Sequence, residues 1–338
     1  MKRPVIPLLA VLLAAAALFS LTLGQYPVPV EDLVAYGGWL LFGSEGNFFT
    51  PEKAGLLEKI LFEIRLPRIL AAMLIGASLA VSGAAFQALF INPLVSPGLL
   101  GVLAGASFGA ALAMVLTSSW VAVQFSTLLF GFTAVAVAAG IARVYLIQSI
   151  IMLVLGGIIS GAFFTALLSL VKYMADPANQ LPAIVHWLMG SLSSVDQVIV
   201  AVVGGPMLIG ILALIFHARQ LNVLSMGEEE AQSLGVDVSR VRVTVIFFAT
   251  MISALTVMIA GMIGWVGLII PHICRMLVGP NNEALLPAAA LLGALYLLVI
   301  DDLSRLMFQF EIPIGIITSL IGIPFFALVL KNARRGWR

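Results

Sequence analysis

The sequence predicts an all-α polytopic membrane protein with ten transmembrane helices. Hydrophobic residues fill 62% of the 338 positions and charged residues only 10%, whereas about a quarter of the residues in a soluble domain are charged. The apolar runs approach twenty residues, the length that a helix needs to cross a hydrocarbon core roughly 30 Å thick. Helices pair every backbone amide internally, and these runs are too long and too continuously apolar for the strands of a barrel.

Polar breaks in the hydropathy define the individual spans. The first is expected to be an uncleaved helix, because its apolar run continues to Leu23 and its removal as a signal peptide would leave an odd number of spans. Asn92-Pro93 and Ser96-Pro97 separate the second span from the third, since proline ends or kinks a helix. The ten expected spans are 4–24, 66–90, 97–117, 120–141, 147–171, 197–216, 242–262, 264–279, 284–301 and 313–331.

The charges outside the spans predict the orientation. An even number of spans places both termini on one side, and a cytoplasmic location of that side puts eleven of the 17 Lys and Arg residues in inner segments, as the positive-inside rule requires. Eleven of the 16 acidic residues then fall outside. We therefore expect cytoplasmic termini and a single membrane domain, 1–338, with a long outer loop at 25–65. The inner basic residues are Lys2, Arg3, Arg143, Arg219, Arg240, Arg242, Arg275, Lys331, Arg334, Arg335 and Arg338.

The most polar inner stretch lies at 217–242. Its sequence is HARQLNVLSMGEEEAQSLGVDVSRVR, and its middle, with Glu228, Glu229 and Glu230 in a row, is expected to form a short helix. A polar helix on the inner face of a membrane protein is typical of a contact with a soluble partner.

Three arginines lie near the outer ends of spans. Arg65 and Arg68 flank Leu66-Pro67 at the start of the second span, and Arg305 follows two aspartates near the end of the ninth. One interpretation is that they snorkel to the interface or pair with acids such as Glu63 or Asp302. The other is a cationic docking surface for an acidic partner, because guanidinium groups bind carboxylates with two hydrogen bonds.

Small residues recur at helical spacing in three places. Such spacing lets helix backbones approach closely in lipid. Packing within the subunit, a dimer contact and the lining of a transport pathway all remain open for these positions. Two of these places contain five glycines, Gly101, Gly105 and Gly109 in GVLAGASFG and Gly157 and Gly161 in GGIISG, and the third place is Gly76 with Ala80.

The sequence lacks the patterns that several other classes of function require. Cys274 is the single cysteine, and His186, His217 and His272 are scattered, so no metal-binding or catalytic arrangement is expected. No G-x-x-x-x-G-K-[ST] motif for ATP occurs, and a net charge of +1 makes nucleic acid an implausible partner. An ion-coupled transporter would need titratable groups at mid-membrane, and the expected spans contain essentially none.

Four ordered blocks of sequence resemble one family over nearly the whole chain. They are RLPRILAAMLIGASLAVSGAAFQALFINPLVSPGLLGVLAGASFGA, LNVLSMGEEEAQSLGVDVSRVR, GMIGWVGLIIPHICRMLVGP and IPIGIITSLIGIPFFALVLK. The chain resembles the permease subunits of the iron-siderophore, haem and vitamin B12 class of ABC importers. This resemblance implies the type II importer architecture, a homodimer with the substrate path along its two-fold axis, in the bacterial inner membrane. It also implies two cytoplasmic ATPase subunits, which bind the ATP and magnesium, and a periplasmic substrate-binding protein, so the chain itself is expected to be neither an enzyme nor a cofactor carrier.

The resemblance also implies a role for the inner polar stretch. Glu229, Ala231 and Gly235 have the E-x-A-x-x-x-G spacing of the coupling segment, a short helix that fits a cleft in the ATPase. Glycine suits the turn after such a helix, and the helix dipole favours acids in its first turn. The residues expected to contact the ATPase are Met226, Gly227, Glu228, Glu229, Glu230, Ala231 and Gly235.

The outer arginines and the cargo are less fully determined. Arg65, Arg68 and Arg305 match positions at which the vitamin B12 permease holds carboxylates of its binding protein, although the adjacent Asp301 and Asp302 could neutralise Arg305.

A ferric siderophore, haem, cobalamin or an oxyanion such as molybdate all remain open as cargo. No span presents a ring of basic residues for an anion.

Overall fold

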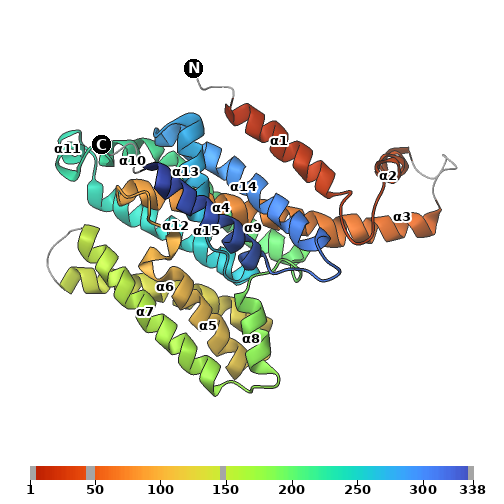
Figure 1. Cartoon of the computed structure of the whole chain (residues 1–338), viewed down its shortest axis with the longest axis horizontal. Helices are drawn as coiled ribbons and strands as arrows, with labels where there is room; N and C mark the ends of the chain where they lie inside the picture. Colours follow the sequence, from red (N-terminus) through yellow and green to blue (C-terminus); the bar gives the residue numbers. More distant parts are fainter. Residues whose placement is uncertain (1–4, 43–49, 145–149, 334–338) are drawn as a thin grey trace.

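The computed structural model describes residues 5–42, 50–144 and 150–333, and over these ranges every regular element is a helix (Figure 1). Several of the basic residues used for the orientation, Lys2, Arg3, Arg334, Arg335 and Arg338, lie outside the described residues. The elements are α1 (Val5–Ser20), α2 (Val30–Phe42), α3 (Pro51–Glu58), η2 (Lys59–Arg65), α4 (Leu66–Leu89), η3 (Pro97–Leu100), α5 (Val102–Leu116), α6 (Trp120–Val144), α7 (Ile150–Met174), α8 (Gln180–Leu188), α9 (Gln197–Phe216), α10 (Ala218–Leu224), α11 (Glu228–Ser233), α12 (Val238–Ala260), α13 (Val266–Val278), α14 (Asn282–Leu306) and α15 (Ile314–Ala333).

A helix lies at each of the ten expected spans. Among the described residues, six helices are long and apolar enough to cross a membrane, namely Glu52–Leu89, Trp120–Arg143, Ile150–Met174, Gln197–Phe216, Val238–Ala260 and Asn282–Leu306. Shorter apolar helices, α1, α5, α13 and α15, occupy the other four positions. The all-helical membrane class is confirmed, and the number of helices that cross the bilayer stays a prediction.

The expected outer loop at 25–65 contains three helical segments, α2, α3 and η2, and its position outside the membrane stays a prediction. α3 and η2 continue without interruption into α4, which produces one apolar helix from Glu52 to Leu89, 38 residues long. At 1.5 Å per residue it measures about 57 Å, well beyond the roughly 30 Å of a hydrocarbon core. One end of this helix therefore projects from the bundle, and α2 folds back beside it (Figure 1).

Pro67 explains why this helix changes its winding instead of ending. Proline lacks the backbone N–H that would donate a hydrogen bond to the carbonyl four residues earlier. The loss of this bond normally kinks or breaks a helix. Here the turn before it, η2, is a π-helix, and the Leu66 N–H bonds the carbonyl of Leu61, five residues back. The wider turn accommodates the proline, and the chain stays helical on both sides of it.

The third expected span begins later than its hydropathy indicates. Residues Pro97–Leu100 form a 3-10 turn, and Gly101 then adopts a left-handed conformation with φ of 82°, so α5 starts only at Val102. Glycine is the residue that takes this conformation without strain. The hydropathy of this segment does not predict the break.

The helices form two groups that share α12. α4 packs along α14 and also contacts α9, α12 and α13, while α5, α6, α7 and α8 form a second group, seen below the first in Figure 1. α12 contacts members of both groups.

The backbones of α4 and α14 approach each other closely at Gly76 of α4 and Gly293 of α14. A methyl group added to either glycine would overlap the backbone of the other. In lipid, where apolar burial alone does not drive association, such close van der Waals contact holds helices together. α4 and α14 therefore form a tight pair at the centre of the first group.

The five glycines singled out in the sequence all lie at packed positions. Gly105 and Gly109 of α5 face the carbonyl groups of α6, Gly157 of α7 faces the backbone of η3, and Gly101 lies against Gly161. These contacts join helices within one subunit. A pathway or dimer role for the same glycines stays a prediction.

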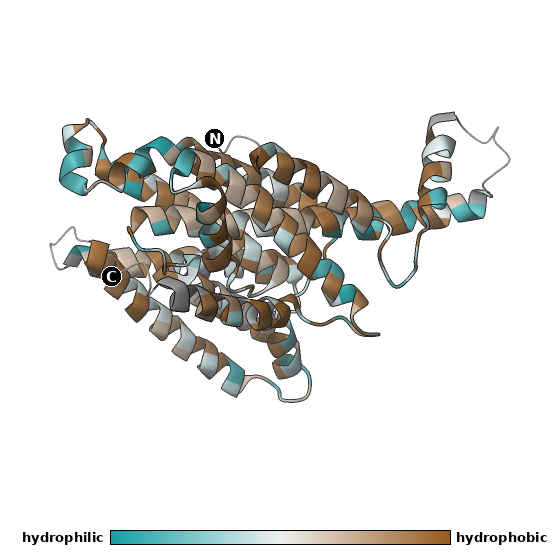
Figure 2. Cartoon of the chain, turned by 45° about the horizontal axis from the view of Figure 1, so that its top comes forward, coloured by the Kyte–Doolittle hydropathy of each residue, from teal (hydrophilic) through white to brown (hydrophobic). Residues whose placement is uncertain are grey.

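The two ends of the bundle differ in polarity. Hydrophilic residues gather on α11 at one end and on the projecting α2–α3 arm at the other, with hydrophobic residues between them (Figure 2). α1 begins, and α15 ends, toward the side of α11 (Figure 1). We call the α11 end "inner" and the opposite end "outer", after the orientation predicted from the sequence.

Candidate functional site

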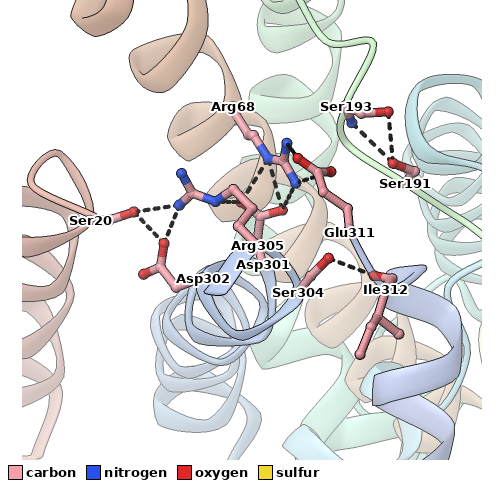
Figure 3. Close-up of polar contacts among 10 residues, drawn as sticks. All are labelled: Ser20, Arg68, Ser191, Ser193, Asp301, Asp302, Ser304, Arg305, Glu311 and Ile312. Atoms are coloured by element: carbon pink, nitrogen blue, oxygen red, sulfur yellow. Dashed lines mark hydrogen bonds and ion pairs between the residues drawn. The ribbon is translucent and has the colours of Figure 1, made fainter. Parts of the chain in front are cut away.

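At the outer end, charged side chains from distant parts of the chain meet in one cluster (Figure 3). Arg68 comes from α4, Asp301, Asp302 and Arg305 come from the last turns of α14, and Glu311 precedes α15. We call these five residues the outer arginine network.

Asp301 is the centre of the outer arginine network. Its carboxylate is fully buried and accepts hydrogen bonds from Nε and Nη2 of Arg68 at 2.9 to 3.0 Å. Nε of Arg305 lies 3.3 Å from Oδ2 of Asp301. One buried carboxylate is thus shared by two guanidinium groups, which is the arrangement that makes burial of these charges tolerable in an apolar environment.

Each arginine of the network also has a second acidic partner. Arg68 donates through Nη1 and Nη2 to the two carboxylate oxygens of Glu311, at 2.8 and 2.9 Å. Arg305 pairs with Asp302 and donates to the hydroxyl of Ser20 at 3.1 Å. Because Ser20 in turn donates to Asp302 at 2.6 Å, the network joins the end of α1 to α14.

Arg65 lies beside the network and holds a different segment. Its two terminal nitrogens donate to the carbonyl oxygens of Leu21 and Tyr26, in the connection between α1 and α2. This arginine therefore fixes the path of the chain where it leaves the bundle for the projecting arm.

The structure brings the three sequence-predicted arginines together, but it buries them. Arg65, Arg68 and Arg305 are only 4%, 6% and 7% exposed. Their formal charges are matched by the three acids of the network. Pairing with acids, part of one of the two interpretations made from the sequence, is present for Arg68 and Arg305, with Asp302 as expected and with Asp301 and Glu311 in addition. Arg65 donates to backbone carbonyls instead. Contact of the arginines with a partner protein stays a prediction.

Glu311 is the member of the network that sequence reasoning missed. It is separated from Arg68 by 243 positions, and no periodicity or motif connects the two residues. Only the fold, which returns the chain from α14 to the start of α15 beside α4, places this carboxylate on the arginine.

At the inner end, the polar stretch folds into two short helices, α10 and α11. Glycines flank α11, with φ of 127° at Gly227 and 81° at Gly235, both in the region that favours glycine. The three successive glutamates occupy its first turn, where the partial positive charge of a helix N-terminus stabilises them. The short helix and its terminal glycine turn agree with the sequence-based expectation.

The surface of α11 combines acidic and apolar groups. Ala231 is fully buried against the helices behind it, whereas Met226 and Leu234 are 65% and 62% exposed. Glu229 and Glu230 are exposed between them. Contact of these side chains with a partner protein stays a prediction.

One ion pair attaches this surface to α12, and a capping residue starts α12 directly after it. Glu228 pairs with Arg242, which ties the start of α11 to α12. Asp237 accepts from the Arg240 N–H and thereby caps α12. We call the stretch from Met226 to Val236 the α11 surface.

Neither end resembles a catalytic or metal centre. His186, His217 and His272 lie in different parts of the fold, Cys274 is buried, and no group of three or more His, Cys, Asp or Glu residues among the described residues could hold a metal ion. The arrangement offers two surfaces for contact, one at each end of a membrane bundle.

Comparison with known proteins gives the family. The model of the FecCD transport family matches residues 12–332. The chain belongs to the FecCD transport family. Family members are transport permease subunits, and the resemblance stated from the four sequence blocks is confirmed. This FecCD permease is accordingly a multi-pass membrane protein.

Two relatives of this FecCD permease have been assigned different cargoes. It is 40% identical to the molybdate import system permease protein MolB of Haemophilus influenzae, over 97% of this chain and 95% of that protein. It is 36% identical to a probable iron chelatin transport system permease protein of Helicobacter pylori, over 86% of this chain and 88% of that protein.

A solved structure has the same fold as this FecCD permease. It is described as an inward-facing conformation of an ABC transporter assigned to the metal-chelate type. The two chains superpose with a TM-score of 0.86 and 38% sequence identity, covering 98% of this chain and 99% of that one. The helical arrangement is therefore that of an ABC transporter permease.

Loss of Asp301 should destabilise the fold far more than loss of an exposed acid. Asp301→Ala leaves two buried guanidinium groups without their shared carboxylate, and breaking a buried pair costs about 3 to 5 kcal/mol. Asp32→Ala is the control, because its pair with Lys53 is partly exposed and such pairs contribute roughly 1 kcal/mol or less. Thermal unfolding in detergent measures both. Equal losses of stability would contradict the central role of Asp301.

Proposed function

We propose that this protein is the membrane subunit of a binding-protein-dependent ABC importer of the type II architecture. It forms a homodimer with the substrate path along the two-fold axis, binds two ATPase subunits at the inner end and receives a periplasmic binding protein at the outer end. The observation that favours this most is the α11 surface, a projecting acidic and apolar helix at one end of the bundle of a FecCD permease. ATP and magnesium are bound by the partner subunits.

The proposed membrane topology of the protein is the one predicted from the sequence. All ten expected spans cross the bacterial inner membrane, and both termini lie in the cytoplasm together with the α11 surface. The helices at the ten positions, and the arrangement of α1 and α15 toward the α11 end (Figure 1), support this topology.

In this proposal the α11 surface occupies a cleft of the ATPase. Met226 and Leu234 supply apolar contact area, and Glu229 and Glu230 supply charge at its edge. Because Ala231 is buried in the bundle, a displacement of α11 by the ATPase would be transmitted to the helices behind it. Nucleotide binding and hydrolysis would thus drive alternating access of the substrate path.

Two substitutions on the α11 surface test the ATPase contact. Glu229→Arg reverses an exposed charge, and Gly235→Pro forces a φ near −65° on a residue with φ of 81°. Both should reduce co-purification of the ATPase subunits, whereas Lys172→Glu, a charge reversal at the outer end of α7, should not. Full recovery of the ATPase with both inner variants would refute this role of the α11 surface.

At the outer end we propose that the arginines dock carboxylates of the binding protein. For this, Arg68 and Arg305 must share their acidic partners with the incoming protein, and Arg65 must share its two backbone carbonyl partners. Glu311 is the most exposed of these partners, at 34% of its side chain, and is the one that a docking carboxylate would replace on Arg68. Asp301 would remain in place and keep Arg68 oriented.

Removal of the competing acid should strengthen docking. Glu311→Gln deletes one negative charge while Asp301 still holds Arg68, so capture of the binding protein should tighten about two- to fivefold at low salt, the magnitude of an exposed ion pair. The gain should shrink as salt screens the charges. Glu283→Gln, the same change at the inner end, is the control. Unchanged or weaker capture by the Glu311 variant at low salt would show that these arginines do not dock the binding protein.

For the cargo we propose a metal chelate such as a ferric siderophore, haem or cobalamin. The similarity to the Helicobacter iron chelatin permease and to the solved metal-chelate type transporter supports this class. Import of molybdate is the alternative, supported by the similarity to the Haemophilus permease. Calorimetric titration of the cognate binding protein with each chelate and with molybdate separates the two, because the binding protein selects the cargo.

An ion-coupled transporter without an ATPase is the less favoured function. It requires titratable groups at mid-membrane, whereas the buried Asp301 and the partly exposed Asp302 lie near the outer end of α14 and pair with arginines. Uptake that continues without ATP and stops when the proton gradient is dissipated would support this alternative.

A further inference from the structure

We propose that α14 carries movement from the α11 surface to the outer arginine network, and that Asn222 is the positioning residue that couples α10 to α14. This inference rests on the proposed function, in which an ATPase displaces α11. It assigns roles to three asparagines, Asn222, Asn281 and Asn282, that neither the sequence patterns nor the proposed function used.

The side-chain amide of Asn222 binds the start of α14 at two points. Its Nδ2 donates to Oδ1 of Asn281 at 2.7 Å, and its Oδ1 accepts from the backbone N–H of Asn282 at 2.8 Å. Two bonds from one planar amide fix both the distance and the orientation of the α14 terminus relative to α10. We call this arrangement the asparagine clamp.

Asn281 has no freedom to rearrange within the clamp. Its Oδ1 also accepts from the Glu283 N–H at 2.9 Å and thereby caps α14. A rotation of the Asn281 amide that turned its nitrogen toward Asn222 would lose this cap, which is typically worth about 1 kcal/mol. The clamp therefore has one direction of hydrogen bonding, with Asn222 as donor and Asn281 as acceptor.

Direct packing connects the clamp to the α11 surface. Leu221 and Leu224 of α10 are buried, and α10 contacts both α14 and α4. Only residues 225–227 separate α10 from α11, and their backbone N–H groups bond carbonyls of α10. A displacement of α11 thus reaches Asn222 through hydrogen-bonded backbone.

α14 then extends from the clamp to the outer end as one helix. Its 25 residues span about 36 Å at 1.5 Å per residue, and its single proline, Pro287, lies near the inner end. The last turns of the same helix supply Asp301, Asp302 and Arg305 to the outer arginine network. The two candidate contact surfaces are therefore joined by one continuous helix, which is a physical connection and not only spatial proximity.

Two asparagine-to-aspartate variants with the same change in charge test the clamp. Asn222→Asp loses the donor and places a carboxylate oxygen against Oδ1 of Asn281. Asn281→Asp keeps the acceptor for Asn222 and the cap of α14, and its charge suits a helix N-terminus. The assay is the ratio of ATPase activity with and without loaded binding protein, for the full complex in liposomes.

We expect Asn222→Asp to lower this stimulation ratio about two- to tenfold, the range that corresponds to one lost hydrogen bond, with the ATPase still co-purifying. Asn281→Asp should keep most of the wild-type ratio. Equal ratios in the two variants, or a wild-type ratio for Asn222→Asp, would overturn the clamp while leaving the proposed function intact. Absence of stimulation in the wild-type complex would instead contradict the proposed function itself.

Discussion

The buried carboxylate of Asp301 is the group on which the arrangement of this protein depends. It pairs with both Arg68 of α4 and Arg305 of its own helix at a fully buried position. Without it the two buried arginines would lose their shared partner, and Glu311 and Asp302 alone would remain to pair with them. Its position fixes the outer end of α14 on α4. Farther along the pair, the contact between Gly76 and Gly293 brings the backbones together. Electrostatics at one end and close packing in the middle thus make α4 and α14 a single rigid element.

This rigid element gives the permease a frame to which both candidate contact surfaces are attached. The inner end of α14 is held by Asn222 of α10, next to the α11 surface, and its outer end belongs to the arginine network. The group formed by α5, α6, α7 and α8 contacts the frame mainly through α12. The proposed alternating access requires parts that move relative to each other, and we expect this movement at the boundary between the two groups.

Much of the architecture followed from the sequence because hydropathy is a local property. The long apolar runs form helices, as expected of segments in lipid. Gly235, which follows α11, has the positive φ expected of a glycine at a helix end. Three features had other origins. The π-turn before Pro67 depends on a helix that continues into the arm, the start of α5 depends on the conformation of Gly101, and the pair of Arg68 with Glu311 depends on a return of the chain after 243 positions. Such contacts are set by tertiary structure, which local patterns do not encode.

The distance between α11 and the outer end of α14 through the transport cycle tests the account most directly. Spin labels at Gln232→Cys in α11 and Leu303→Cys in α14, with the buried native Cys274 replaced by alanine, report this distance by pulsed electron paramagnetic resonance. The account predicts that it is the same with and without ATP, while the distance from Gln232→Cys to a label at Leu170→Cys in α7 changes. An α11–α14 distance that changes as much as the α11–α7 distance would contradict a rigid connection between the two ends.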